Sequence, residues 1–260
     1  MPINIVLGNR PDWVELIVPR LGAGFKANDE LLHALLTAGA EVIAPLDLSD
    51  YDVLRANSTF LKKALIPSAK SVRLCNDKQL FRDWFLTHFD HSYLPLKTKK
   101  SKFSIAKPRI GVSGVGSRLI ESSDLQAIAA VESNSAMCLE DYIFGSKEFA
   151  FHILFDQDKS LYAAKATHLH KSAVYIQGSN RSPPTTFIET CTEIPPIFIE
   201  LLRKLNYSGT ACIDYKFDET GQIKILEVNP RIGFSLISEI DSYMFAYANH
   251  VLNREFQLEP

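Results

Sequence analysis

The stretch DYKFDETGQIKILEVNPR, residues 214–231, decides the fold of this chain. Two apolar, β-branched runs flank an Asp-Glu-Thr-Gly turn, a pattern that predicts a β-hairpin. Side chains of a strand alternate between the two faces of a sheet, so Glu227 and Asn229 share one face. Asp214 can lie beside them on the partner strand. The hairpin therefore gathers three oxygen-bearing side chains in one place.

These oxygen donors suit a hard divalent cation. Mg²⁺ is usually held in proteins by one or two carboxylates together with substrate phosphates. Arg231 follows directly, and its guanidinium can bind phosphate or carboxylate through two parallel hydrogen bonds. An ordinary surface hairpin with solvated carboxylates is the alternative, and the hairpin alone does not decide between the two.

Length and composition are those of an ordinary globular protein. The 260 residues suffice for one large domain or for two or three small ones. The net charge of −2 gives no indication of nucleic-acid binding, which usually requires a basic face. No apolar run approaches the length of a membrane span. We therefore expect neither a nucleic-acid partner nor a membrane partner.

The cysteines and the N-terminus indicate a cytoplasmic protein. Cys75, Cys138, Cys191 and Cys212 lack metal-site spacing, which predicts reduced thiols in a reducing compartment. The first residues have no basic region and no long apolar core, so we expect no signal peptide.

Periodicity and turn residues predict an α/β fold that begins with a small parallel strand–helix–strand unit. The predicted strands cover residues 3–7, 41–44, 103–106, 119–120, 136–139, 148–155, 160–166, 213–217 and 223–228. The predicted helices cover residues 30–38, 51–65, 76–88, 124–131, 195–205 and 236–252, with Asn76 and Ser123 as N-caps.

Further residues with the chemistry of a nucleotide site precede the hairpin. In chain order they are Asp77-Lys78, Lys107 with the glycines Gly111, Gly114 and Gly116, the run Glu140-Asp141-Tyr142-Ile143, and Glu148. Glycines without a Cβ let backbone N–H groups close over phosphate oxygens, and a lysine supplies a point charge. A flexible turn and a surface lysine are the alternatives for the loop and for Lys107.

This order resembles the ATP-grasp superfamily over residues 69–250, most specifically in Leu226-Glu-Val-Asn-Pro-Arg. The spacing of thirteen residues from Asp214 to Glu227 also fits. The resemblance implies a small N-terminal α/β domain over residues 1–68 and a subdomain with a glycine-rich lid over 69–140. A second subdomain with the metal site, over 141–260, would clasp the nucleotide from the other side.

The resemblance also implies a role for each residue. Two lysines would clamp the nucleotide, residues 140–143 would read the adenine edge, and Glu148 would accept hydrogen bonds from ribose. Glu148 stands one residue further from its preceding glycine than is common in the family, and an edge-strand glutamate facing water is the alternative. The ATP ligands so assigned are Lys78, Lys107, Gly111, Gly114, Gly116, Glu140, Asp141, Tyr142, Ile143, Glu148 and Lys165. The resemblance implies that Asp214, Glu227 and Asn229 would bind the metal, Mg²⁺ or Mn²⁺. It also implies that Arg231 and Lys107 would be the catalytic residues.

The implied reaction is that of an ATP-dependent ligase. It would join a carboxylate to an amine, on amino-acid or peptide-like substrates, through an acylphosphate, and would release ADP and phosphate. Attack of a carboxylate on ATP brings two anions together, so the site must neutralise charge. A phosphotransferase or carboxylase-type enzyme and a non-catalytic nucleotide-binding subunit remain alternatives.

Small-molecule carboxylate and amine substrates are the partners that we expect, and a homodimer stays open. The short N-terminal region indicates a small or unusual acid, or an acid site completed by a partner chain. His168 and His170 share one strand face and can face the substrate or solvent. The roles of these histidines and of Arg181 stay open.

Overall fold

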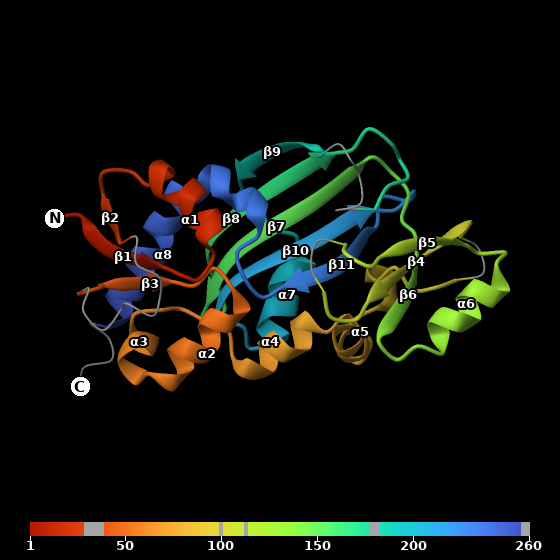
Figure 1. Ribbon diagram of the computed structural model, residues 1–260, viewed down its shortest axis with the longest axis horizontal. Helices are drawn as coiled ribbons and strands as arrows, with labels where there is room; N and C mark the ends of the chain where they lie inside the picture. The colour runs from red at the N-terminus through yellow and green to blue at the C-terminus, as the bar shows by residue number, and fades with distance from the viewer. Residues whose placement is uncertain (29–38, 99–100, 112–113, 177–182, 256–260) are drawn as a thin grey trace.

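The architecture is that of a computed structural model, which describes residues 1–28, 39–98, 101–111, 114–176 and 183–255. In this described part the strands form an N-terminal sheet, a small sheet and a large sheet, connected and covered by helices (Figure 1). The helix predicted over residues 30–38 and the loop residue Arg181 lie outside the described residues. The α/β fold class is confirmed.

The described elements have the following bounds. The strands are β1 Ile3–Leu7, β2 Phe25–Asn28, β3 Val42–Ala44, β4 Phe103–Pro108, β5 Arg118–Glu121, β6 Met137–Asp141, β7 Lys147–Asp156, β8 Lys159–Leu169, β9 Thr185–Thr190, β10 Gly209–Phe217 and β11 Ile223–Asn229. The α-helices are α1 Pro11–Ile17, α2 Leu48–Ala56, α3 Ser58–Lys62, α4 Ala69–Asn76, α5 Lys78–Leu86, α6 Leu125–Glu132, α7 Pro196–Lys204 and α8 Ile240–Glu255. Short 3₁₀ helices are η1 Val18–Arg20, η3 His91–Tyr93 and η4 Phe234–Glu239.

The N-terminal sheet has the order β2-β1-β3 and is parallel, as predicted for the start of the chain. The buried carboxylate of Asp50 joins its loops, since it accepts the backbone N–H groups of Asn9, Leu46 and Asp47 at 2.9, 2.8 and 2.8 Å. Gly8 leaves the room for this carboxylate, because a Cβ there would collide with it. Three hydrogen bonds to one buried carboxylate therefore fix the loops that follow β1 and β3.

The large sheet has the order β11-β10-β7-β8-β9, and its neighbours are antiparallel. Helices α4, α5 and α7 cover one face of it, where Phe85 and Phe198 pack with Phe151 and Tyr215 of the sheet. The alternate residues of β7 and β10 face the other side. That second face carries Glu148 and Asp214, which line the pocket described below.

The small sheet has the order β5-β4-β6, with α6 packed against it, and lies at the opposite end of the molecule from the N-terminal sheet (Figure 1). Helix α8 returns to the N-terminal sheet, where its tyrosines share a core with β1 and β3. The domain boundaries at residues 68 and 140 stay predictions. Helices α4 and α5, which follow residue 68, share their apolar core with the large sheet, and α5 also contacts β6 of the small sheet through Arg82, which donates to the carbonyl of Leu139 at 3.2 Å.

Several predicted helix boundaries are wrong, each for a local reason. The helix predicted over residues 76–88 begins at Lys78, because Asp77 accepts the N–H groups of Gln79 and Leu80 and so caps α5. A separate helix, α4, ends at Asn76. In the same way Asn57 ends α2 and caps α3 within the helix predicted over 51–65.

Two other helices also start elsewhere than predicted. Asp124, not Ser123, is the N-cap of α6, since its side chain accepts the N–H of Ala127. The C-terminal helix begins at Ile240, after the 3₁₀ turn η4. Strands β2 and β9 and helix α1 were not predicted.

Candidate functional site

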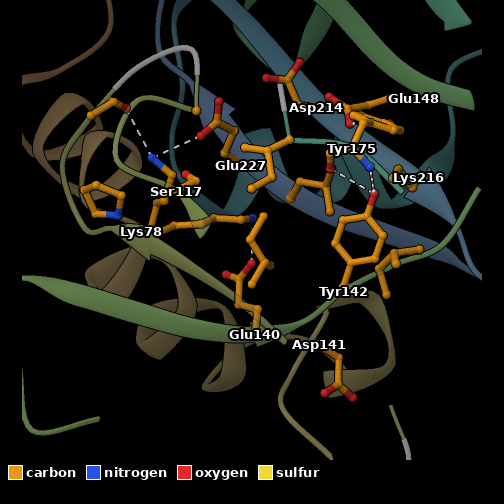
Figure 2. Close-up of a pocket in the computed structure, with 18 of the residues that line it drawn as sticks. Lys78, Ser117, Glu140, Asp141, Tyr142, Glu148, Tyr175, Asp214, Lys216 and Glu227 are labelled. Atoms are coloured by element: carbon orange, nitrogen blue, oxygen red, sulfur yellow. Dashed lines mark hydrogen bonds and ion pairs between the residues drawn. The ribbon is translucent and has the colours of Figure 1, made fainter. Parts of the chain in front are cut away.

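A pocket lies between the small sheet and the large sheet (Figure 2). It encloses about 770 Å³ of empty space, counting its open mouth. Many of the predicted site residues line it: Lys78, Lys107, Gly111, Gly114, Glu140, Asp141, Tyr142, Ile143, Glu148, Asp214 and Glu227. The fold therefore brings together residues up to 149 positions apart, from Lys78 to Glu227.

Lys78 stands at one end of the pocket, on the first turn of α5. Its Nζ lies 3.1 Å from Oε2 of Glu227 and donates to the carbonyl of Gly111 at 3.2 Å. Its backbone N–H donates to the carbonyl of Arg109, whose guanidinium binds both carboxylate oxygens of Asp77 at 3.1 and 2.7 Å. The start of α5 and the glycine loop are thus held to each other next to the lysine.

Lys107 reaches the pocket from β4 and pairs with Glu140 of β6, Nζ to Oε2 at 2.6 Å. Burial lowers the pKa of Lys107, but the carboxylates of Glu140, Glu227 and Glu148, with Glu140 contributing most, together outweigh burial and the net shift is upward. Lys107 therefore stays an ammonium group inside the pocket. The structure excludes the alternative of a plain surface lysine.

The predicted metal ligands come together across the hairpin of β10 and β11. Asp214 is the register partner of Glu227, and Nδ2 of Asn229 donates to both carboxylates, at 2.9 Å and 3.2 Å. Burial and the neighbouring Glu227 raise the pKa of Asp214 well above its usual value. Burial also opposes ionisation of Glu227, but Lys78 and Lys107 outweigh it and lower the pKa of Glu227.

The donor set fits a divalent cation. Among the described residues, no group of three or more His, Cys, Asp or Glu side chains could hold a metal. The predicted set differs from such a group because it has two carboxylates and the amide of Asn229, whose Nδ2 faces both carboxylates. Asp214 forms no ion pair with a cation in the described ranges, so its negative charge lacks compensation. A bound cation would supply that compensation and return the pKa of Asp214 downward.

The chain from Asp141 to Glu148 leads to the other end of the pocket. Glu148 is 7% exposed, and its Oε2 accepts the hydroxyl of Tyr175 at 2.7 Å. Burial raises its pKa, although Tyr175 and Lys216 partly offset that effect. Glu148 does not face water, so the alternative of a solvated edge-strand glutamate is wrong.

Asp141 and Tyr142 use their side chains differently within this segment. The carboxylate of Asp141 points away from the pocket and accepts the backbone N–H of Thr98 at 3.0 Å (Figure 2). The hydroxyl of Tyr142 donates to the carbonyl of Tyr175 at 3.0 Å and accepts the N–H of the same residue at 2.9 Å. Asp141 thus anchors the segment, and Tyr142 ties Tyr175 to the pocket wall.

The family described as carbamoyl-phosphate synthase L chain, ATP binding domain, matches residues 100–247, more than half of this chain. The chain belongs to this ATP-grasp family. The resemblance drawn from residues 69–250 is confirmed. A search of curated proteins found no match.

Solved ATP-grasp structures share the fold. D-alanine–D-alanine ligase from Bacillus anthracis, complexed with ATP, aligns with a TM-score of 0.61 and 15% identity over 100% of this chain and 99% of that one. The D-alanine–D-alanine ligase from Coxiella burnetii aligns with a TM-score of 0.63 and 12% identity, over 99% of this chain and 97% of that one. L-amino acid ligase from Bacillus licheniformis aligns with a TM-score of 0.59 and 14% identity, over 96% of this chain and 73% of that one. At these identities the likeness establishes the fold.

The ATP-grasp pocket contains a lysine that the sequence interpretation missed. Lys216 lines the pocket and is 3% exposed. It stands two residues after Asp214 on β10, so both side chains lie on the same face of the strand. The alternation that placed Glu227 and Asn229 together would have identified Lys216 as well.

Lys165 lies away from the pocket. It is the register partner of Phe151, whose ring packs with α7, so Lys165 is on the face of the large sheet opposite to Glu148 and Asp214. Its Nζ pairs with Glu189 at 2.6 Å. A phosphate contact by Lys165 does not agree with this position.

Arg231 and Gly116 lie at the border of the site and not in the pocket wall. Nη1 of Arg231 donates to the carbonyl of Ile232 at 2.9 Å, and its guanidinium lies 6.0 Å from the ring centre of Trp13. The arginine thus stands just past Asn229, where the N-terminal unit meets the large sheet. Gly116 has φ of +78° in the turn that begins at Gly114. The catalytic role of Arg231 stays a prediction.

His168 lies in β8 and His170 directly follows this strand, and the two side chains have different surroundings. His168 is the register partner of Glu148, and its Nδ1 lies 2.9 Å from the hydroxyl of Thr186. Burial lowers its pKa to about 4, so its ring is neutral at pH 7. His170 stacks on Tyr175 with ring centres 3.4 Å apart. His170 therefore supports the pocket wall through Tyr175, whereas His168 contacts Thr186 of β9.

Proposed function

We propose that this protein is an ATP-dependent ligase that joins a carboxylate to an amine through an acylphosphate and releases ADP and phosphate. The supporting observation is the convergence of two lysines with two carboxylates and an amide at one end of a single pocket. Membership in an ATP-binding family supports ATP as the nucleotide.

The proposed orientation of ATP follows from the charges. The phosphates lie toward Lys78, Lys107 and the glycine loop, whose backbone N–H groups and ammonium groups attract them. The adenine lies toward residues 140–143, and the ribose lies toward Glu148. Mg²⁺ or Mn²⁺, held by Asp214, Glu227 and Asn229, would neutralise phosphate charge and align the phosphate oxygens.

The proposed reaction has two steps. A carboxylate oxygen of the acid attacks the γ-phosphorus, the bond to the bridging oxygen breaks, and ADP leaves with the electron pair. The amine then attacks the acyl carbon, the carbon–oxygen bond to phosphate breaks, and the amine loses a proton. Lys78 and Lys107 hold the phosphates during the first step, and Arg231 binds the anionic acceptor beside them.

The test is a screen of the full chain with ATP, MgCl₂ and a panel of amino acids and small carboxylic acids. Formation of ADP that depends on one acid, with a hydroxamate when hydroxylamine is added, supports the ligase. Hydroxylamine captures acylphosphates, so a stable phosphorylated product without hydroxamate would instead indicate a phosphotransferase. Nucleotide binding without turnover for any acid would indicate a non-catalytic subunit. Glu227→Ala is the matched inactive control.

We also propose that the protein acts in the cytoplasm on small molecules. The supporting observation is that all four cysteines are free, and that Cys75, Cys138 and Cys212 are buried. Within the described ranges, no helix has the length and apolar character that crossing a membrane requires. Fractionation of the native cells followed by detection of the protein would test the location.

A further inference from the structure

The buried ammonium group of Lys216 contacts two aromatic rings and one backbone carbonyl. Its Nζ donates to the carbonyl of Gly145 at 2.8 Å and lies 5.3 and 4.7 Å from the ring centres of Tyr142 and Tyr175. Within the described residues, no carboxylate lies within ion-pair distance of it. It differs in this respect from Lys107, which has Glu140 at 2.6 Å.

Such an environment leaves part of the ammonium group unsatisfied. An ammonium has three N–H donors, and the carbonyl of Gly145 takes one of them. A buried donor without an acceptor is unfavourable. A ligand that brings an acceptor to this place would therefore bind better than one that does not.

The position of Lys216 indicates which part of a ligand it meets. The pairing of Tyr215 with Phe149 on the neighbouring strand puts Lys216 beside Glu148. Figure 2 shows Lys216, Tyr175 and Glu148 together, on the side of the pocket away from Lys78. With phosphates at Lys78 and the base at residues 140–143, the sugar side of the nucleoside lies next to Lys216.

We propose that Lys216 is a nucleotide-binding residue whose ammonium donates a hydrogen bond to an acceptor on the sugar side of the bound nucleoside. Two atoms can supply this acceptor, the 2′-oxygen of the ribose and N3 of the purine. The inference rests on the proposed nucleotide site and adds to it a residue that selects ribonucleotides or purines. The aromatic faces of Tyr142 and Tyr175 hold the ammonium in place before the nucleotide arrives.

The first test measures binding of MgADP to the full chain by titration calorimetry. Lys216→Met keeps an unbranched side chain and removes the donor, so we expect the affinity to fall about ten- to a hundredfold. Lys224→Met is the matched control. Lys224 lies on β11 outside the pocket wall, and its Nζ contacts the carbonyl of Ser92 and Asp218. This control should bind MgADP as the wild type does.

The second test identifies the acceptor with 2′-deoxy-ADP and 3-deaza-ADP. The analogue that lacks the acceptor should bind the wild type more weakly than ADP does, and the difference should shrink in Lys216→Met. If the wild type binds all three nucleotides equally, the inference is wrong, and this result requires no variant. An equal loss of affinity for all three in Lys216→Met would also overturn it, because the lysine would then only shape the wall.

The titration distinguishes a failure of the proposed nucleotide site from a failure of the proposed role of Lys216. If the folded wild type binds no MgADP at all, the nucleotide site itself is wrong and the role of Lys216 falls with it. If the wild type binds MgADP and Lys216→Met binds it equally well, the nucleotide site stands and only the role of Lys216 is wrong. Thermal unfolding of each variant shows whether it is folded before the titration.

Discussion

The two ends of the pocket stabilise buried charge in different ways. At the end with Lys78 and Lys107, each ammonium faces a carboxylate, at 3.1 Å from Glu227 and 2.6 Å from Glu140. At the end with Lys216, the ammonium lies against two tyrosine rings and one carbonyl. One end thus carries matched ion pairs, and the other carries a cation without a partner carboxylate.

The difference shows in the direction of the pKa shifts. Burial lowers the pKa of Lys107 and of Lys216. The nearby carboxylates, Glu140 foremost, reverse this effect on Lys107, whereas on Lys216 Glu148 does not reverse it. The lysine of the paired end therefore keeps its charge, whereas Lys216 loses its proton at a lower pH than an ordinary lysine.

The largest effect should come from removing Glu227 at the paired end. Glu227→Ala removes a predicted metal ligand and the partner of Lys78, so we expect turnover to fall by a factor of about 1,000 or more. The fold should change little, because the side chain faces the site. ADP formation and circular dichroism measure the two effects. Undiminished turnover at saturating Mg²⁺ would contradict the metal assignment.

A smaller effect concerns stability at the same end. Glu140→Gln leaves the ammonium of Lys107 buried without its carboxylate, which should lower the free energy of unfolding by about 3 kcal/mol. Urea unfolding at pH 7 measures this. Replacing both partners, Lys107→Met with Glu140→Leu, should recover much of the loss. If the double variant is no more stable than Glu140→Gln, the pair is not the cause.

At the unpaired end, the stability contribution of Lys216 should depend on pH. The pKa of Lys216 is lowered to about 8 in the folded protein, below its unfolded value, so the unfolded chain binds more protons between pH 8 and pH 10. Its contribution to stability therefore rises with pH across that window. Relative to Lys216→Met, the wild type should gain about 1–2 kcal/mol from pH 7.5 to pH 10. A constant difference would show that Lys216 has an ordinary pKa.

The smallest effect concerns the choice of base. Residues 140–143 present an extended backbone to the base, and adenine offers it the N6 donor and the N1 acceptor, whereas guanine reverses this pattern. We expect ATP to compete at least about tenfold better than GTP, a difference of one well-made hydrogen bond. Displacement of a fluorescent ATP analogue by each nucleotide measures this. Equal displacement by the two nucleotides would show that residues 140–143 do not bind the base. It would not affect the assignment of the phosphates to the paired end.

The parts of the site that could be predicted from the sequence are those fixed locally. The hairpin was predicted because its turn is built by its own residues: Asp218 accepts the N–H groups of Thr220 and Gln222. The convergence of Asp214 with Glu227 follows from strand alternation once that turn is known. The order of the motifs along the chain then indicated the ATP-grasp family, and the match to the family model confirmed it.

Positions that depend on the pairing of distant strands could not be predicted in the same way. Which face of β8 carries Lys165 depends on its register with β7, and that register places it opposite to the pocket. Strand β9 is mostly exposed, with the sequence Thr-Thr-Phe-Ile-Glu-Thr, so it lacks a clear apolar alternation. The cap at Asp77 was missed because Asn76 has the same local chemistry. In the structure Asp77 accepts the N–H groups of Gln79 and Leu80 and also binds Arg109, which is distant in the sequence.

The return of α8 to the N-terminal sheet has a consequence for synthesis on the ribosome. The hydroxyl of Tyr247 accepts the N–H of Leu65 at 2.8 Å and donates to the carbonyl of Ile43 at 2.9 Å. The core around Ile5 thus includes side chains more than 200 positions later in the chain. During synthesis β1 and β3 must therefore wait for α8 before their core is complete. Until then this end of the nascent chain exposes apolar surface that a chaperone can bind.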